Sequence, residues 1–181
     1  MGLVEPESQD DPYFNFFLSE LSRCFPYVNL FPWAAARLFS TSRLHPALRQ
    51  SVIAVASLIA DNGVGGAQQS HFKAREHLQQ ALIQLQSQIS ATGADEGIAI
   101  SSFLLAHFSM MLGDYQTAKK HLNGMKVILV SLDSGGSRFV HGVAVPSPLK
   151  VDELTMLFWR MAIRIDFISS VACGNSPILP R

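Results

Sequence analysis

The chain has 181 residues, enough to bury the hydrophobic core of one ordinary domain and too few for two comfortable ones. Lys plus Arg and Asp plus Glu number 14 each, so the net charge is zero and no overall field attracts nucleic acid or an anionic membrane. The only cysteines, Cys24 and Cys173, exclude a disulfide framework and a cysteine-rich metal module.

The chain begins with an acidic stretch that we expect to be a disordered tail over residues 1–11. Its first 20 residues contain no Lys or Arg but five carboxylates, at Glu5, Glu7, Asp10, Asp11 and Glu20. Interleaved acidic and aromatic residues are also typical of activation segments, but we favour a solvated tail whose Phe16 and Phe17 dock on the core. No basic region followed by an apolar run is present at the start, which predicts an intracellular protein without a secretory signal.

Two helices with almost no charge are predicted over residues 46–62 and 97–112. Pro46 suits a first helical turn, and Asp95 suits the start of the second helix, where negative charge favours the positive end of the helix dipole. Each helix is shorter than the roughly 20 apolar residues that cross a bilayer. Because the chain is 48% hydrophobic and only 15% charged, we expect both to be inner helices covered on more than one side.

A long helix is predicted from Ala67 to about Ala91. Its predicted core stripe is Phe72, Leu78, Leu82, Leu85 and Ile89. Its predicted water-facing residues are Gln79, Gln80, Gln84, Gln86 and Gln88. The Gly-rich residues 63–69 follow a helix rather than a strand, and they lack the last glycine of a dinucleotide-binding loop, so they do not indicate a nucleotide site.

Two further helices are predicted in the C-terminal half. A tight turn at Gly113-Asp114 leads into a helix with core positions Ala118, Leu122, Met125, Leu129 and Leu132. A loop follows over residues 133–150, with a brief extended piece at 139–145. The last helix begins at Asp152 and Glu153 and ends near Gly174, with a predicted core stripe of Leu154, Leu157, Phe158, Met161, Ile165 and Ile168. The predicted fold class is therefore all-α, built from stacked antiparallel helix hairpins.

No pattern in the sequence indicates catalysis or metal binding. His71 and His77 are six residues apart and lie on different helix faces, whereas two ligands on one face need a spacing of three or four. The HExxH, GxSxG and GxxxxGK[ST] motifs are missing from the sequence. We therefore predict no catalytic, metal or cofactor-binding residues, and no enzyme.

One charged group stands out within the apolar last helix. Arg160 and Arg164 are four residues apart and share a helix face, and Asp166 follows them. Two guanidinium groups on one face suit an anionic effector or an acidic partner segment. The alternative, which we favour, is a structural ion-pair network that includes a buried carboxylate. Arg160, Arg164 and Asp166 are accordingly the candidate contacts for a partner or effector.

Three segments together resemble the fungal-specific regulatory region, or middle homology region, of zinc-cluster transcription factors. They are HPALRQSVIAVASLIA, DEGIAISSFLLAHFSMMLGDYQTAKKHLNGMKVIL and FWRMAIRIDFISSVACGNSPILP. The resemblance covers residues 12–181. Its most specific parts are GD-x4-KKHLNGM, which contains His121, Leu122 and Gly124, and WR-x3-R-x-D near Gly174 and Pro177.

The resemblance implies an all-helical regulatory domain over residues 12–181 that acts in the nucleus. Its implied partners are proteins, either co-regulators or the rest of a transcription factor, and a homodimer is an open alternative. No six-cysteine cluster precedes the domain, and the chain ends where family members continue, so we expect a truncated, N-terminal part of such a domain. We therefore expect no cofactor in this chain, zinc belonging only to an upstream cluster, and no direct contact with nucleic acid or a membrane.

A helical adaptor of the tetratricopeptide type is the alternative function. The Gly113-Asp114 hairpin and the YQTAKKHL phrase favour it. The sequence shows no repeat of the roughly 34 residues that this architecture requires, which counts against it.

Overall fold

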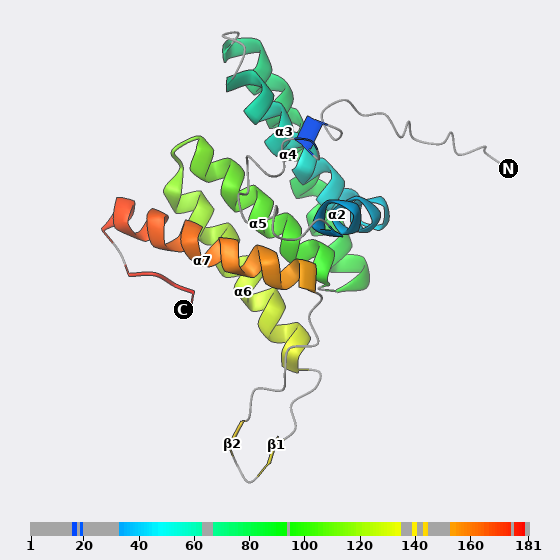
Figure 1. Ribbon diagram of the computed structural model, residues 1–181, viewed down its shortest axis with the longest axis vertical. Coiled ribbons are helices and arrows are strands. Elements are labelled where there is room, and N and C mark those ends of the chain that lie inside the picture. Colours follow the sequence, from blue (N-terminus) through cyan, green and yellow to red (C-terminus); the bar gives the residue numbers. More distant parts are fainter. Residues whose placement is uncertain are drawn as a thin grey trace, which may run out of the picture.

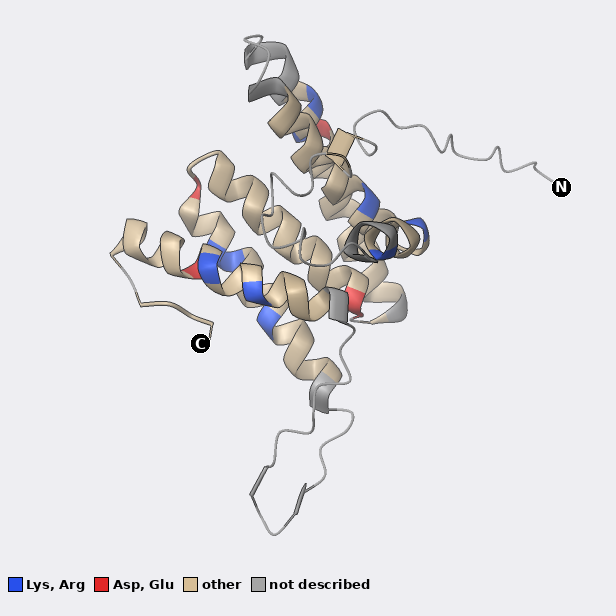
Figure 2. Cartoon of the chain, in the orientation of Figure 1, with Lys and Arg blue, Asp and Glu red and all other residues tan. Residues whose placement is uncertain are grey.

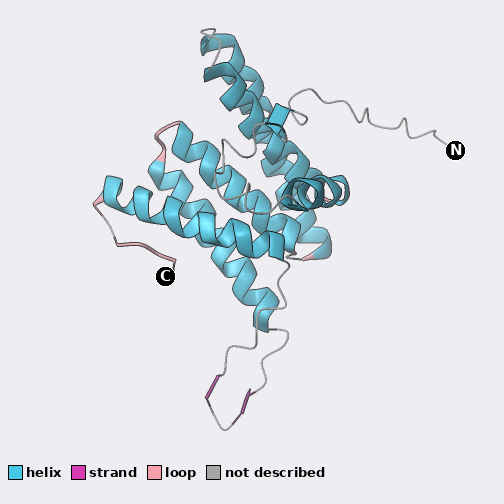
Figure 3. Ribbon diagram, viewed as in Figure 1, coloured by secondary structure: helices cyan, strands magenta, loops and turns pink. Residues whose placement is uncertain are grey.

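The computed structural model describes residues 16, 17, 19, 33–62, 67–93, 95–134, 139–140, 143–144, 153–174 and 176–179. Its helices are α2 (Trp33–Leu44), α3 (Pro46–Asn62), α4 (Ala67–Thr92), α5 (Glu96–Met111), α6 (Tyr115–Ser134) and α7 (Glu153–Cys173). Two short strands, β1 (Phe139–Val140) and β2 (Val143–Ala144), pair antiparallel within the predicted loop. The predicted all-α class is confirmed (Figure 3). The predicted tail at residues 1–11 lies outside the described residues.

The helices pack as neighbouring pairs. Helices α3 and α4 lie along each other, and so do α5 and α6, which a three-residue turn connects. Helix α3 also packs on α5, and α7 crosses both α5 and α6 (Figure 1). This arrangement places α3 and α5 in the interior, with α4, α6 and α7 around them.

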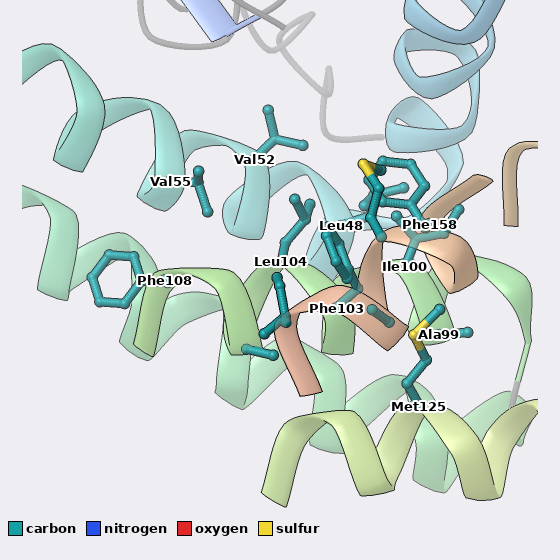
Figure 4. Close-up of a cluster of buried hydrophobic side chains, with 14 of the residues drawn as sticks. Leu48, Val52, Val55, Ala99, Ile100, Phe103, Leu104, Phe108, Met125 and Phe158 are labelled. Carbon is teal, nitrogen blue, oxygen red and sulfur yellow. The ribbon is translucent and has the colours of Figure 1, made fainter. Parts of the chain in front are cut away.

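Helices α3 and α5 are the inner helices that the low charge predicts. All side chains from 51 to 58 and from 97 to 106 are buried. Leu48, Val52 and Val55 of α3 point into one apolar cluster with side chains of α5, and Met125 and Phe158 reach it from α6 and α7 (Figure 4). In the described part of the chain no helix is both long enough and apolar enough to cross a bilayer.

Serine hydroxyls allow polar residues to be buried inside these two helices. Ser51 and Ser57 donate hydrogen bonds to the carbonyl oxygens of Ala47 and Ile53, four residues earlier, at 2.8 Å each. Ser101 of α5 donates to the Gly97 carbonyl in the same way, at 2.7 Å. Because each hydroxyl is satisfied within its own helix, it needs no partner from the surrounding apolar core.

Aspartates begin the two helices of the α5–α6 pair. The Asp95 carboxylate accepts a hydrogen bond from the backbone N–H of Ile98 at 2.8 Å, and Asp114 accepts one from Thr117 at 3.0 Å. These are N-cap bonds, which satisfy backbone donors that the first helical turn leaves open. The predicted helix starts at Asp95 and after Gly113-Asp114 are confirmed.

The prediction for α4 is wrong for three of the five residues of its stripe. Phe72, Leu82 and Ile89 are exposed, while Leu78 and Leu85 are partly buried against the core. Ala74 and Ala81 are fully buried instead. Two of the glutamines predicted to face water, Gln84 and Gln88, are half-buried, and the Gln88 side chain accepts a hydrogen bond from the backbone N–H of Ala47. The buried face of α4 is therefore rotated toward the small alanines, which permit a close approach to α3.

The predicted stripe of α6 is confirmed, and that of α7 is confirmed except at Ile168, while the side chain of Leu154 lies outside the described residues. Ala118, Leu122, Met125 and Leu129 of α6 are buried and Leu132 is partly buried, as predicted. In α7, Leu157, Phe158, Met161 and Ile165 are buried. Ile168 is 52% exposed, so its assignment to the core is wrong. The α7 face that turns inward at this level carries Asp166, Ser169 and Ser170 instead.

Phe17 confirms the predicted docking of the N-terminal aromatics. Its side chain is fully buried in the core cluster, and Phe16 packs against that cluster.

Candidate functional site

Asp166 organises the polar centre of the region where α6 and α7 meet the C-terminal residues. We call residues 176–179 the strap. The Asp166 carboxylate is fully buried and accepts hydrogen bonds from the backbone N–H groups of Ile178, at 2.6 Å, and Leu179, at 2.7 Å. The Ser170 hydroxyl donates to the same carboxylate at 3.4 Å. A buried carboxylate is tolerated only when donors of this kind replace water.

Two lysines of α6 hold the other side of the strap backbone. The Lys119 ammonium donates to the Ser176 carbonyl oxygen at 3.2 Å, and the Lys126 ammonium donates to the Ile178 carbonyl oxygen at 3.0 Å. The strap therefore lies between α6 and α7, with its acceptors bonded to one helix and its donors to the other. The Leu179 side chain is only 4% exposed and belongs to the core cluster, which anchors the strap by apolar contact as well.

The chain reaches this position because α7 stops at a glycine. Gly174 adopts a φ of +66°, a left-handed conformation that costs little only for glycine, and its N–H bonds to the Val171 carbonyl at 3.2 Å. The chain thus leaves the end of α7 and folds back beside it (Figure 1).

The outer face of α7 has a different character. It comprises Arg160, Arg164, Phe167, Ile168 and Val171, whose spacing of 4, 3, 1 and 3 residues places them on one side of a helix. Both arginine side chains are exposed, and the three apolar side chains are 48%, 52% and 67% exposed. Basic residues gather along α7 and the adjacent α6 (Figure 2).

The structure does not place the three predicted contact residues in one cluster. Arg160 and Arg164 lie on the exposed outer face, as their spacing of four predicts. Asp166 lies on the buried side of the same helix and bonds to the strap backbone. The buried carboxylate of the favoured structural interpretation is present, and its oxygens accept hydrogen bonds from two backbone N–H groups and the Ser170 hydroxyl.

Sequence reasoning missed Lys119, Lys126 and the strap. The bonds from these lysines join residues 57 and 52 positions apart, and no local pattern reports contacts over such distances. The KKHLNGM segment carries part of the family resemblance, but its pattern does not indicate what the lysines contact.

Burial favours the neutral form of two histidines. Desolvation by burial lowers the pKa of His107 to about 4, and its ring stacks on Phe103 with centroids 6.3 Å apart. Burial also lowers the pKa of His121, against the opposing effect of Asp114. Within the described residues, no three His, Cys, Asp or Glu side chains lie close enough together to hold a metal ion. These histidines are part of the packing of α5 and α6.

Residues 12–181 match the family model of the fungal specific transcription factor domain. The chain belongs to that family. No curated protein and no solved structure matches it. Membership confirms the resemblance carried by the three sequence segments, and it makes transcription regulation the function of this fungal transcription factor domain, with the nuclear role that such a function implies.

Proposed function

We propose that this fungal transcription factor domain regulates transcription in the nucleus by binding other proteins through the outer face of α7, without itself contacting DNA. The observation that carries the proposal is the combination, on one exposed helix face, of Arg160 and Arg164 with Phe167, Ile168 and Val171. The partner that suits this face is an acidic, amphipathic segment of a co-regulator or of another part of a transcription factor.

The chemistry of the outer face supports this kind of partner. Exposed apolar side chains on successive helical turns gain about 25 cal/mol for each Å² that a partner covers. Arginines beside them offer bidentate hydrogen bonds to carboxylates, and arginine is enriched at protein interfaces. A helix that places its own apolar residues on Phe167 and Ile168 and its acidic residues on the arginines fulfils both requirements.

The charge of the domain supports a role without DNA contact. The chain has zero net charge, whereas sequence-independent DNA binding depends on neutralising several phosphates with a basic surface. No enzymatic activity and no cofactor are part of the proposal, because the family is one of transcription factor domains.

A reporter assay tests the proposal. The full chain is fused to an unrelated DNA-binding domain, and transcription of a reporter carrying its target site is measured in fungal cells. We expect the fusion to raise or lower transcription relative to the DNA-binding domain alone. The double variant Arg160→Glu and Arg164→Glu should abolish that difference at equal protein level, since it replaces two positive charges by two negative charges, which repel an acidic partner.

The matched control places the same charge change elsewhere. Lys73 and Arg75 are exposed on α4, so Lys73→Glu with Arg75→Glu should leave reporter transcription unchanged. Equal loss in both double variants would refute the assignment to α7. A fusion that binds cellular proteins but never alters transcription would instead favour the helical adaptor.

A further inference from the structure

Side chains of α6 and α7 bind the strap through its backbone, as peptide-binding proteins bind the main chain of a ligand. Four of its backbone groups form hydrogen bonds with side chains: two N–H groups donate to Asp166, and two carbonyl oxygens accept from Lys119 and Lys126. These three side chains come from two helices that are separate in sequence, and none of them contacts a strap side chain through these bonds. The backbone of the strap is thus recognised independently of its sequence, as in other peptide-binding sites that bond to the main chain.

We propose that the slot between α6 and α7 is a peptide-binding site, occupied in this structure by the strap of the same chain, which accepts an extended peptide from another protein in exchange. The slot comprises Lys119, Lys126, Asp166 and Ser170, together with the core position that receives Leu179. This site is separate from the outer face of α7.

The side chains of the strap define the ligand class. Leu179 is almost completely buried and Ile178 is packed against the core, whereas Ser176 and Pro177 are exposed. A ligand therefore needs two adjacent aliphatic residues, of which the second enters the core, and it needs free backbone N–H groups at both. Proline before them is compatible, because its fixed φ favours an extended chain and the structure uses no N–H at that position.

The buried carboxylate makes exchange more favourable than simple release. If the strap leaves and nothing replaces it, Asp166 keeps its buried position but loses two backbone donors, and an unpaired buried charge is strongly destabilising. A second peptide restores both donors and refills the Leu179 position. The slot therefore favours an occupied state, whichever chain supplies the occupant.

Binding of a synthetic strap peptide tests the proposal on the full chain. The probe is a fluorescein-labelled peptide of sequence NSPILPR, residues 175–181, and its anisotropy is measured against protein concentration. The wild-type strap competes with the probe, since a tethered segment has an effective concentration on the order of millimolar. Leu179→Asp removes the competitor, so we expect it to bind the probe at least about tenfold more tightly than wild type.

Two controls locate the binding. In the Leu179→Asp background, Lys126→Gln should weaken probe binding, whereas Lys120→Gln, an exposed lysine of the same helix, should leave it unchanged. A probe that itself carries Leu179→Asp should not bind. Binding that is insensitive to Lys126→Gln would place the peptide elsewhere and overturn the proposal.

Two further results would test the proposal. A Leu179→Asp chain with wild-type far-UV circular dichroism that does not bind the probe overturns the proposal. If that variant does not fold, isotopically labelled wild-type chain is titrated with unlabelled peptide to millimolar concentration. The amide resonances of Ile178 and Leu179 should then move toward those of an unbound strap while those of α3 stay in place, and their failure to move refutes exchange.

Discussion

Helices α4 and α5 belong to the same fold but differ in how many of their residues are buried and in which kinds. In α5, twelve of 16 residues are buried, including serines and a glycine. In α4, only Ala74 and Ala81 are fully buried among the described side chains, while Phe72 and Ile83 are 71% and 53% exposed. Several of the larger apolar residues thus lie outside on α4 and its fully buried residues are small, whereas α5 buries large and small residues alike.

The neighbours of each helix explain the difference. Helix α5 contacts α3, α6 and α7, so almost every position meets another helix. Helix α4 packs chiefly on α3, and its remaining circumference has no other extensive contact in the described structure. The comparison shows that the burial of a residue depends on how many neighbours surround its helix, and only secondarily on its own hydrophobicity.

The largest expected effect comes from placing a charge on each helix. Leu104 of α5 is fully buried, and Leu104→Asp should unfold the protein, because an unpaired buried charge costs several kcal/mol against a total stability of about 5–15 kcal/mol. Leu82 of α4 is 40% exposed, and Leu82→Asp should cost about 1 kcal/mol or less. Thermal melts followed by far-UV circular dichroism measure both, and equal losses would mean that α4 and α5 do not differ in how deeply these positions are buried.

A smaller effect comes from the titration of His107 within α5. Because burial lowers its pKa from 6.5 to about 4, the unfolded chain binds a proton below about pH 6.5 that the folded chain does not bind until about pH 4. The contribution is therefore fully present above pH 6.5 and is lost as the pH falls toward 4, by about 3 kcal/mol at most. Urea unfolding of wild type and His107→Gln at several pH values measures it.

The variant should show a shallower decline in the free energy of unfolding between pH 6.5 and 4 than wild type. It should not abolish the decline, because the pKa of His121 is lowered in the same direction. Parallel pH profiles for the two proteins would mean that folding does not lower the pKa of His107.

The smallest expected changes in stability come from replacing two helical glycines by alanine. A Cβ at Gly97 of α5 would meet the ring of His45, whose Nδ1 lies 3.4 Å from the Asp95 carboxylate, so Gly97→Ala should destabilise by about 1–3 kcal/mol. At Gly124 of α6 nothing lies within 4 Å of an added Cβ, and Gly124→Ala should stabilise by up to about 1 kcal/mol. Shifts of the same sign in the two melting midpoints would show that helix propensity outweighs the contact with His45.

Sequence patterns predicted the helices themselves because helix signals are local. Pro46 at the start of α3, Asp95 before α5 and the Gly113-Asp114 turn are each recognised from neighbours within four residues. The low charge of α3 and α5 also predicted their inner position, since a residue buried on every side tolerates no unpaired charge.

The faces of the outer helices were harder to predict. Hydrophobic periodicity selected Phe72 and Ile168 as core residues, and both are exposed. Alanines and serines occupy the buried positions nearby, where close helix packing or a local hydrogen bond satisfies them. A periodicity weighted by residue hydrophobicity cannot detect such positions, because their burial depends on the approach of another helix.

The sequence alone determined which segments are helical, which helices are interior, and the family to which the chain is similar, because these properties depend on residues close together along the chain. The bonds of Asp166, Lys119 and Lys126 to the strap could not be read from the sequence and are visible only once the helices are packed. Those bonds join residues 12 to 57 positions apart, and their geometry exists only after α6 and α7 have packed.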